Sequence, residues 1–433
     1  MSSISSLYQI YLNHPTICTD TRKITEGCIF LALKGDRFDA NTFAAQALQE
    51  GAAYAIIDNP EYQISDKCIL VEDVLSTLQE LARHHRKQLS IPVVGLTGTN
   101  GKTTTKELIN AVFSTKYRSY ATQGNLNNHI GVPLSILSIT KETEIAVIEM
   151  GANHQQEIGF LCTIAQPTHG LITNVGLAHL EGFGGFEGVK IGKGELYAYL
   201  KQHNGTVFVN SDNPHLIEMS STAKLNDIVW YGSNPSDYIY GELLSSDPLL
   251  EVSWTLQSET SVASINLTGG YNFENVLAAI CLGSYFNTDP KSINDGLASY
   301  IPKNNRSQII KTLSNTVICD FYNANPSSMS AALKNLSTLS FGHKTVIIGD
   351  MFELGNESGK QHEIIAQEAA ALEIDQLILI GDYFYALRDK YQGRFFNTPD
   401  EAAHYLQDNP PQHSLILLKG SRGMALEKLL PLL

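Results

Sequence analysis

The sequence predicts an α/β protein made of three consecutive domains. The chain has 433 residues, and a domain commonly holds about 150, so the length favours three hydrophobic cores over one. Short apolar stretches alternate with helical patterns along most of the chain, which is typical of βαβ units and mainly parallel sheets. Hydrophobic residues make up 43% of the chain and charged residues 17%. This composition can bury large cores and differs from that of disordered chains.

Residues 1–89 predict a small N-terminal α/β domain. An alanine-rich helical pattern at 41–50 stops at Gly51, as helices often do, and a polar, basic helix is expected at 77–89. The residue before a proline favours extended backbone, so the Ser90-Ile91-Pro92 break indicates a boundary between 89 and 90. Three apolar stretches have the length of strands, at 28–33, 53–57 and 69–71.

Residues 90–301 predict a central domain with a mainly parallel sheet and, at 238–267, a β meander. Ligands of parallel sheets bind beyond the carboxyl ends of the strands. Residues that directly follow a strand are therefore candidates for a site. The strands are expected at 93–96, 144–150, 170–175 and 206–210, and the helices from 102 onward and at 155–165, 186–201 and 271–286.

Residues 302–433 predict a third, Rossmann-like α/β domain. A Pro/Asn break at 301–305 marks its start. No GxGxxG fingerprint accompanies the alternation, so we infer no dinucleotide there. The strands are expected at 316–320, 345–349, 376–381 and 414–418, and the helices at 327–339, 362–372, 401–407 and 424–430.

Charge and cysteine usage exclude several classes of protein. Lys and Arg number 30 against 44 Asp and Glu, and the net charge of -14 speaks against general affinity for nucleic acid or anionic lipid. The six scattered cysteines form no CxxC pair, which favours reduced thiols. The first twenty residues lack a signal-peptide pattern, and no run of 18 apolar residues occurs. We expect a cytoplasmic protein without a membrane span.

The strongest motif is Thr97-Gly98-Thr99-Asn100-Gly101-Lys102-Thr103-Thr104, between an apolar strand and a helix. In such a loop, backbone N–H groups and the helix N-terminus converge on phosphates, the lysine contacts β/γ oxygens, and the next hydroxyl can hold Mg²⁺. The usual spacing is GxxxxGK[ST], whereas this chain has GxxGKT because position 96 is leucine. An ordinary tight turn is the alternative. The strand-loop-helix context favours a P-loop-type ATPase domain.

Three further residues fit a metal-bound triphosphate. Glu149 closes one predicted strand and His179 follows another, at the sheet edge where phosphates would lie. Lys193 lies on the helix predicted at 186–201. Each has a plainer alternative: a solvated acid for Glu149, a loop histidine for His179, and a surface lysine for Lys193.

Nine strings then follow one another along the chain. They are TDTR at 19–22, GNLNNHIGVP at 124–133, EMGANH at 149–154, TNVGLAHLEGFG at 173–184, KGE at 193–195, GGYNFENVLAA at 269–279, YNANPSSM at 322–329, GDMFELG at 349–355 and KGSRGM at 419–424. In this order they resemble the Mur ligases nearly end to end. The set is far more specific than a loop motif alone.

The resemblance implies a UDP-binding N-terminal domain, a central ATPase domain and a C-terminal ligase domain that closes over the site, with a hinge near 301–305. It implies ATP and Mg²⁺ as cofactors. Lys102, His179 and Lys193 are implied as catalytic, with Lys193 carbamoylated so that an anionic oxygen replaces an ammonium beside the metal. The implied metal ligands are Thr103, Glu149, His179 and Lys193, and Asp20, Thr21 and Arg22 are implied to contact the UDP-muramoyl group.

The resemblance also implies a nucleotide site shared by two domains. Beyond the loop residues Gly98, Thr99, Asn100, Gly101, Lys102, Thr103 and Thr104, it implies nucleotide contacts by Asn272, Asn275, Arg306, Asp320, Asn323 and Asn325. Three positions depart from the family pattern. Thr21 replaces a serine, and Asn41 and Tyr271 replace histidines, which leaves the contacts of the last two open.

Within the family, YNANP and KGSRGM favour the ligase that adds D-alanyl-D-alanine to UDP-N-acetylmuramoyl-tripeptide through an acyl phosphate, in peptidoglycan precursor synthesis. We expect it to act as a monomer. The alternatives are the ligase that adds the third residue, whose DNPR string is absent here, and a folylpolyglutamate synthase-like ligase. A nucleotide-gated binding module is the alternative outside the enzymes.

Overall fold

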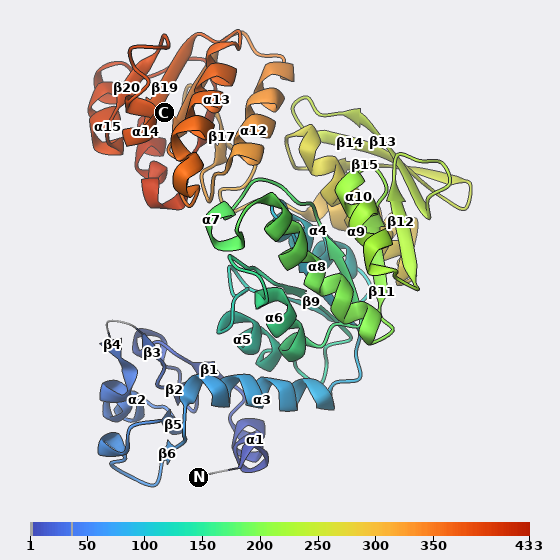
Figure 1. The fold of residues 1–433 in the computed structure, drawn as a ribbon, viewed down its shortest axis with the longest axis vertical. Coiled ribbons are helices and arrows are strands. Elements are labelled where there is room, and N and C mark those ends of the chain that lie inside the picture. Colours follow the sequence, from blue (N-terminus) through green and yellow to red (C-terminus); the bar gives the residue numbers. More distant parts are fainter. Residues whose placement is uncertain (1–2, 36–37) are drawn as a thin grey trace.

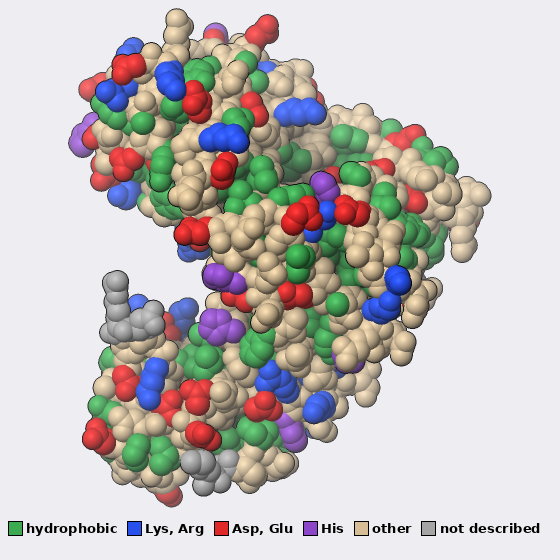
Figure 2. All heavy atoms as spheres, in the orientation of Figure 1, with side chains coloured by type: hydrophobic (Ala, Val, Ile, Leu, Met, Phe, Trp, Pro, Cys, Tyr) green, Lys and Arg blue, Asp and Glu red, His purple; other side chains and the backbone are tan. Residues whose placement is uncertain are grey.

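The computed structural model describes residues 3–35 and 38–433. It contains three α/β parts that follow one another around a C-shaped outline, and the N- and C-terminal parts form its two ends (Figure 1). Figure 2 shows an open hollow between those ends. Each of the three large sheets lies within one predicted domain range. The boundaries at 89/90 and 301/302 themselves stay predictions.

The N-terminal part contains a four-stranded parallel sheet. Its strand order is β1-β2-β5-β6, with β1 (Ile17–Cys18), β2 (Ile29–Leu31), β5 (Tyr54–Ile57) and β6 (Cys68–Leu70). A short hairpin joins β3 (Lys34–Gly35) to β4 (Phe38–Asp39). The helix predicted at 41–50 is instead a 3-10 turn (Ala40–Phe43) followed by α2 (Ala44–Gln49), because the Asp39 carboxylate accepts from the Asn41 N–H and starts a tighter turn.

Two helices attach this part to the central one. α3 (Val74–Gln88) begins three residues before its predicted start, because Asp73 caps it by accepting from the Ser76 N–H at 2.7 Å. Its Arg86 guanidinium donates to the carbonyls of Ala165 and Gln166 in the central part. α1 (Ile4–Asn13) packs against α3, and their buried side chains join the central core. α3 therefore packs against both the N-terminal and the central part (Figure 1).

A nine-stranded sheet forms the central part. Its order is β15-β14-β13-β12-β11-β10-β7-β9-β8, and all neighbours pair in parallel except β13-β14 and β14-β15, which form the predicted meander. The parallel strands are β7 (Val93–Thr97), β8 (Ser119–Ala121), β9 (Ile145–Glu149), β10 (His169–Ile172), β11 (Thr206–Asn210), β12 (Ile228–Gly232) and β13 (Ile239–Ser245); the meander continues through β14 (Leu250–Leu256) and β15 (Glu259–Ile265).

Helices cover both faces of this sheet. The core on one face contains α4 (Lys102–Phe113), α10 (Phe273–Tyr285) and α11 (Pro290–Ser299). On the other face lie α5 (Gly131–Leu137), α6 (Glu157–Ala165), the short α7 (Leu180–Phe183), α8 (Phe186–Gln202) and α9 (Pro214–Ala223). No helix was predicted from the sequence at the positions of α5, α7, α9 or α11.

The C-terminal part is a six-stranded sheet of order β16-β17-β21-β18-β19-β20, parallel except at the β16 edge. Its strands are β16 (Gln308–Lys311), β17 (Thr316–Asp320), β18 (Lys344–Gly349), β19 (Gln376–Ile380), β20 (Arg394–Phe396) and β21 (Leu415–Lys419). Its helices are α12 (Pro326–Thr338), α13 (Ser358–Ala370), α14 (Asp382–Tyr385) and α15 (Pro399–Asp408). The helix predicted at 424–430 is a 3-10 helix, Leu426–Leu432, which contains Pro431 and follows a shorter one at Arg422–Met424.

No helix in residues 3–35 or 38–433 is long and apolar enough to cross a membrane. The six cysteines all lie in the described part of the chain, where they are unpaired and buried.

Candidate functional site

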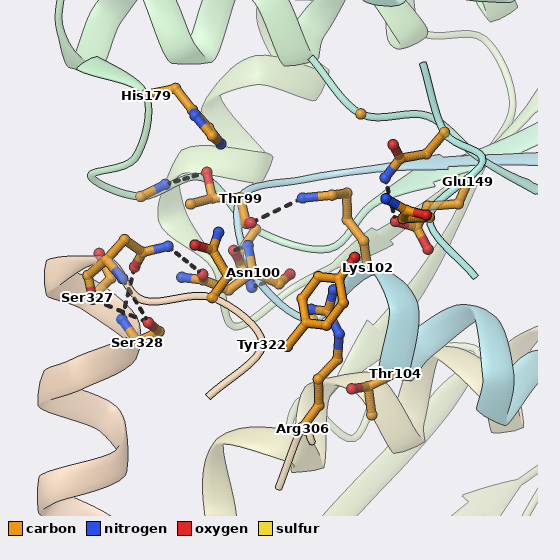
Figure 3. Close-up of a pocket in the computed structure, with 18 of the residues that line it drawn as sticks. Thr99, Asn100, Lys102, Thr104, Glu149, His179, Arg306, Tyr322, Ser327 and Ser328 are labelled. Atoms are coloured by element: carbon orange, nitrogen blue, oxygen red, sulfur yellow. Dashed lines mark hydrogen bonds between the residues drawn. The ribbon is translucent and has the colours of Figure 1, made fainter. Parts of the chain in front are cut away.

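A cavity of about 840 Å³ lies between the central and C-terminal parts. The phosphate-loop motif and the carboxyl ends of β9 and β10 line its central side (Figure 3). Residues that follow β17, β18 and β21 line the opposite side. Both parallel sheets therefore direct their carboxyl ends into one cavity, as expected for ligand sites in open α/β sheets.

The phosphate-loop motif connects β7 to α4 and requires glycine at two positions. Gly98 has φ +148°, and a Cβ there would lie 1.9 Å from the Thr173 hydroxyl. Gly101 has φ +77°, and a Cβ there would lie 2.6 Å from the Asn275 amide oxygen. The backbone amides of Thr99 and Asn100 are held by Asn174 at 2.9 Å each. The loop is thus fixed by its neighbours rather than being an ordinary tight turn.

Lys102 is the first residue of α4 and extends beside the loop. Its Nζ donates to the carbonyls of Gly98 at 2.8 Å and Thr99 at 3.0 Å. Burial lowers the pKa of this ammonium to about 8, nearby Glu149 opposes the shift, and Arg306 adds to it. A phosphate could replace the two carbonyls as acceptor and would supply the missing negative charge.

Glu149 ends β9 as a buried carboxylate with one oxygen unused. Its Oε1 accepts from Asn127 at 2.8 Å and from the Thr103 hydroxyl at 3.3 Å. Its Oε2 is buried and has no hydrogen-bond partner among the described residues. The side chain is 1% exposed, which excludes the alternative of a solvated strand-end acid. A buried carboxylate oxygen beside a threonine hydroxyl fits Mg²⁺, which prefers oxygen ligands.

His179 lies in the loop after β10 with φ +51° and also faces the cavity. Its Nδ1 lies 2.6 Å from the Glu353 carboxylate of the C-terminal part. Burial lowers the pKa of His179, Glu353 opposes this, and the positive charges of Lys102 and Lys193 add to it. The lowered pKa favours the neutral imidazole, which is the form that can hold a metal.

Lys193 lies on α8, behind the residues that line the cavity. Only 2% of it is exposed, so the alternative of a surface lysine is wrong. Its Nζ donates to the Ala152 carbonyl at 3.2 Å and lies 4.9 Å from the centre of the Phe183 ring. Burial, with a further contribution from Lys102, lowers its pKa to about 7. The structure thus favours a neutral amine at this position.

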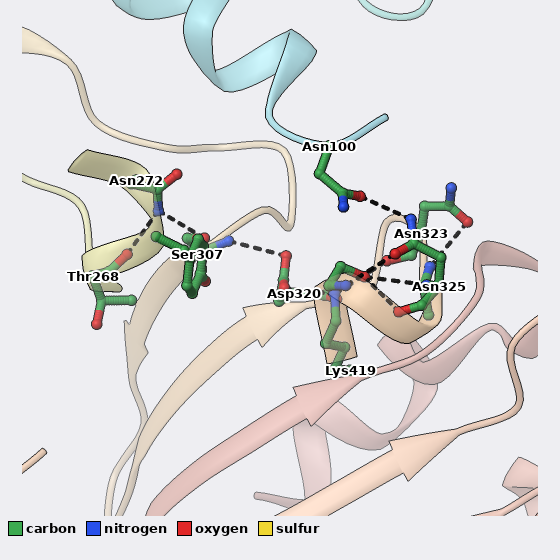
Figure 4. Close-up of polar contacts among 11 residues, drawn as sticks. Asn100, Thr268, Asn272, Ser307, Asp320, Asn323, Asn325 and Lys419 are labelled. Atoms are coloured by element: carbon green, nitrogen blue, oxygen red, sulfur yellow. Dashed lines mark hydrogen bonds and ion pairs between the residues drawn. The ribbon is translucent and has the colours of Figure 1, made fainter. Parts of the chain in front are cut away.

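A hydrogen-bond relay connects α4 to the C-terminal sheet, and Figure 4 shows its part from Thr268 and Asn272 to Lys419. The Asn275 amide oxygen accepts from Thr105, and its Nδ2 donates to Asn272, whose own Nδ2 donates to the Thr268 carbonyl and to the Ser307 hydroxyl. The Ser307 N–H donates to Asp320 at 3.3 Å, and Lys419 donates to the same carboxylate at 2.7 Å. The two predicted asparagines and Asp320 therefore belong to one connected wall.

Tyr271 is one of the positions that depart from the family pattern. Its hydroxyl bonds to Ser307 at 2.8 Å, so it reinforces the relay at the point where the chain enters the C-terminal part. Asn41 is another position that departs from the family pattern. It is fully buried, contacts Asp39 and Asp58, and lies outside the cavity. Its role in the structure is to hold the N-terminal part together.

The start of α12 closes the cavity against the phosphate loop. Asn325 caps α12 and its Nδ2 donates to the Asn100 side chain at 2.8 Å across the two parts. The Ser327 hydroxyl accepts from the Leu177 N–H at 3.2 Å. Asn323 lines the cavity, and its carbonyl accepts from Lys419. The structure therefore brings this end of the C-terminal sheet to the loop, as predicted.

The cavity brings together most of the predicted residues but not all. It is lined by Thr99, Asn100, Gly101, Lys102, Thr104, Glu149, His179, Asn272, Asn275, Arg306, Asp320, Asn323 and Asn325. Gly98, Thr103 and Lys193 lie behind this surface. Asp20, Thr21 and Arg22 lie in the N-terminal part, where the Arg22 guanidinium donates to the Asp20 carboxylate at 2.7 Å.

Several cavity residues of the C-terminal part were not among the predicted site residues, and four of them are Tyr322, Phe352, Glu353 and Arg422. Arg306 lies over the Tyr322 ring at 3.9 Å and Arg422 at 5.0 Å. The strings YNANPSSM, GDMFELG and KGSRGM contain all four residues. Their position directly after predicted parallel strands was the signal that could have found them.

The fold and the cavity define a class: α/β proteins in which a phosphate-binding loop faces a second α/β domain across a shared site. The Mur ligase middle domain model matches residues 96–283, and the model of the Mur ligase glutamate ligase domain matches residues 305–422. The chain belongs to the Mur ligase family.

Several relatives carry one name. The UDP-N-acetylmuramoyl-tripeptide--D-alanyl-D-alanine ligases of Bacillus subtilis (strain 168) and Escherichia coli (strain K12) are 34% and 36% identical, and each alignment covers 95% of this chain and 92% of the relative. A crystal structure of MurF from Acinetobacter baumannii is 33% identical with a TM-score of 0.86, covering 96% of this chain and 92% of that chain. MurF from Thermotoga maritima in complex with ADP is 27% identical with a TM-score of 0.85, covering 100% and 98%.

Proposed function

We propose that the protein is an ATP-dependent ligase that joins D-alanyl-D-alanine to UDP-N-acetylmuramoyl-tripeptide. One observation carries the proposal: a single cavity contains the phosphate loop with Lys102, the strand-end carboxylate Glu149 and the strand ends of a second α/β domain. The relatives named for this reaction align over nearly the whole chain, which supports this reaction over addition of the third residue or of glutamate to a folate. We assign residues 1–89 to UDP binding, 90–301 to ATP binding and 302–433 to ligation.

The reaction proceeds in two steps. The terminal carboxylate of the tripeptide attacks the γ-phosphorus of ATP, the bond to the bridging oxygen breaks, and ADP leaves. The amine of D-alanyl-D-alanine then attacks the acyl carbon, loses a proton, and orthophosphate leaves as the amide forms. Phosphoryl transfer of this kind depends on positioning and on neutralising charge. Lys102 and Arg306 supply positive charge beside the phosphate loop.

Mg²⁺ fits the residues present, because Glu149 Oε2 is buried with no partner among the described residues, and the Thr103 hydroxyl bonds to the other oxygen of the same carboxylate. Glu149, Thr103 and His179 would hold it, and the ion would neutralise phosphate charge. Lys193 would contribute as a carbamate, because its neutral amine can add to CO₂ and the product is anionic. The Asp20-Thr21-Arg22 turn would contact the UDP group. Closure of the C-terminal part over the cavity would protect the acyl phosphate from water.

The deciding experiment measures product by mass spectrometry and orthophosphate release in parallel. The enzyme is offered ATP, D-alanyl-D-alanine and UDP-muramoyl-tripeptides that differ in the third residue. A ligase releases orthophosphate only when acid, amine and ATP are all present, and forms one amide per phosphate. Turnover of ATP without the acid or the amine would instead indicate a nucleotide switch.

The compartment and the assembly are part of the same proposal. The six unpaired, buried cysteines accord with a reducing environment, and we place the enzyme in the cytoplasm as a monomer.

A further inference from the structure

Lys106 is a lysine whose side chain is completely buried in the central part. It lies on α4, four residues after Lys102, and 0% of it is exposed. Its Nζ donates to the Thr122 carbonyl at 2.5 Å and pairs with the Glu107 carboxylate at 2.8 Å. A buried ammonium loses its hydration, and a methionine would fill a similar space without that cost. A lysine at this position therefore calls for a role beyond packing.

Thr122 connects Lys106 to the backbone of Glu149. It directly follows β8 and is 1% exposed. Its N–H donates to the Val147 carbonyl at 3.0 Å, as in a parallel ladder. The Glu149 N–H donates to the Thr122 hydroxyl, also at 3.0 Å, rather than to the Thr122 carbonyl. That carbonyl accepts from Lys106, so a single residue joins α4 to the end of β9.

The same helix contacts Glu149 a second time, at its side chain. The Thr103 hydroxyl donates to Glu149 Oε1 at 3.3 Å. Thr103 and Lys106 are three positions apart on α4, so they lie on one side of the helix. α4 therefore holds Glu149 at two points, the carboxylate through Thr103 and the backbone through Lys106 and Thr122. Two points of attachment fix where the carboxylate lies relative to the Thr103 hydroxyl.

The segment after Thr122 leads back to the same carboxylate. Asn127 Nδ2 donates to Glu149 Oε1 at 2.8 Å, and the Asn127 carbonyl accepts from the Gly151 N–H at 2.7 Å. Asn127 lines the cavity, whereas Lys106 and Thr122 do not. The bond between Lys106 and Thr122 anchors the start of this segment to α4. Lys106 thus supports the surroundings of Glu149 without touching the cavity.

We propose that Lys106 is a positioning residue for the metal-binding carboxylate, which it holds in place through Thr122. The inference rests on the metal site of the proposed function, and it adds a residue outside the cavity that sets the affinity of this site for a divalent cation. Without the ammonium, the buried Thr122 carbonyl has no donor, which favours a shift of Thr122 that carries the Glu149 backbone with it. Loss of the groups that orient a metal ligand weakens metal binding about 10–100-fold.

The first test measures binding of Mn²⁺, in place of Mg²⁺, to the enzyme with ADP bound, from the EPR signal of free Mn²⁺. In Lys106→Met the Kd for Mn²⁺ should rise about 10-fold. The Kd for ADP without metal should stay within about twofold, because Lys106 does not line the cavity. An unchanged Kd for Mn²⁺, or an equal loss of metal-free ADP binding, would overturn the proposal.

The second test uses Thr122 and does not depend on whether Lys106→Met folds. Thr122→Val removes the hydroxyl that accepts from the Glu149 N–H and should raise the Kd for Mn²⁺ about 10-fold, whereas Thr122→Ser keeps the hydroxyl and should stay within about twofold of the wild type. Equal Kd values for the two variants would overturn the proposal.

The double variant Lys106→Met/Thr122→Val tests whether the two residues act in series. It should bind Mn²⁺ no more than about twofold more weakly than the weaker single variant, because both changes break one connection. Independent effects would multiply to about 100-fold and would overturn the proposed connection through Thr122.

Lys201→Met is the matched control. The Lys201 ammonium also donates to a main-chain carbonyl of the central part, that of Ala223 at 2.8 Å, but it lies in the last turn of α8 and does not line the cavity. We expect wild-type Kd values for Mn²⁺ and for ADP. Equal weakening by Lys201→Met and Lys106→Met would indicate a general loss and contradict the proposal. A wild type that binds no Mn²⁺ with ADP present would instead overturn the proposed metal site.

Discussion

Lys193 should react with CO₂ because the protein holds its amine neutral. Its pKa is about 7, against 10.5 for an ordinary lysine. At pH 7.5 this change raises the neutral fraction from about 0.001 to about 0.8, a gain of several hundredfold in the form that can add to CO₂. The amine nitrogen bonds to the carbon and a proton is released. The resulting carbamate carries a negative charge, which suits the positive charge of nearby Lys102.

The sign of the pH dependence follows from this pKa. Below pH 7 the amine is protonated and cannot react, so carbamate and activity should fall together. Above pH 7 the amine is available and carbamate formation should be limited by CO₂. Removal of CO₂ at pH 7.5 should therefore lower the ligation rate, and added bicarbonate should restore it. Enzyme exchanged into ¹³C-bicarbonate should show a carbamate carbon by NMR.

Lys193→Ala tests the same point by substitution. Loss of the carbamate that would help to hold Mg²⁺ should lower kcat about 10–100-fold. Short-chain carboxylates should restore part of the activity by occupying the space left. Lys190→Ala is the control, because Lys190 lies on the same helix but pairs with Glu218 at 2.8 Å and does not line the cavity. Full activity of Lys193→Ala, or no carbamate signal in the wild type, would refute the reasoning.

Three further predictions concern the cavity. Lys102→Ala should lower ligation at least about 10³-fold with an unchanged Tm, because Nζ bonds only to carbonyls of its own loop; full activity would exclude the loop from the mechanism. Glu149→Gln should weaken the apparent Mg²⁺ affinity about 10–100-fold in a titration of the ligation rate, and an unchanged titration would remove it from the metal site. Tyr271→Phe loses the hydrogen bond to Ser307 and should raise the KM for ATP about 2–10-fold; an unaltered KM would contradict the role of the relay.

Local patterns predicted most of the parallel strands, because buried strands are short apolar runs between breaks. They failed where a side chain or a proline sets the local geometry. Asp73 moves the start of α3, Asp39 tightens the turn before α2, and the final segment, which contains Pro431, forms a 3-10 helix. They also missed α11, whose Asp289 cap and first-turn Pro290 were readable start signals. These errors concern boundaries and types of element rather than the class of fold.

The residues of the candidate site also fall into two groups, those that the local sequence identified and those that it did not. The spacing of the phosphate-loop motif identified Lys102 and its neighbours because one continuous segment forms that loop. Tyr322, Phe352, Glu353 and Arg422 could have been named as residues that follow predicted strands, but their sequence does not show that they share one cavity with the motif. Only the pairing of β18 with β21, and the meeting of two sheets, brings them to the cavity.

The sequence by itself thus determined the α/β class, the phosphate loop and the family, because each depends on residues that are neighbours in the chain. The tertiary structure alone decided which oxygen of Glu149 has no partner among the described residues, that Lys193 is buried rather than exposed, and that Arg422 lines the same cavity as Lys102. Burial and the distance between charges depend on how distant segments pack, and these quantities set the pKa values and the affinity for anions.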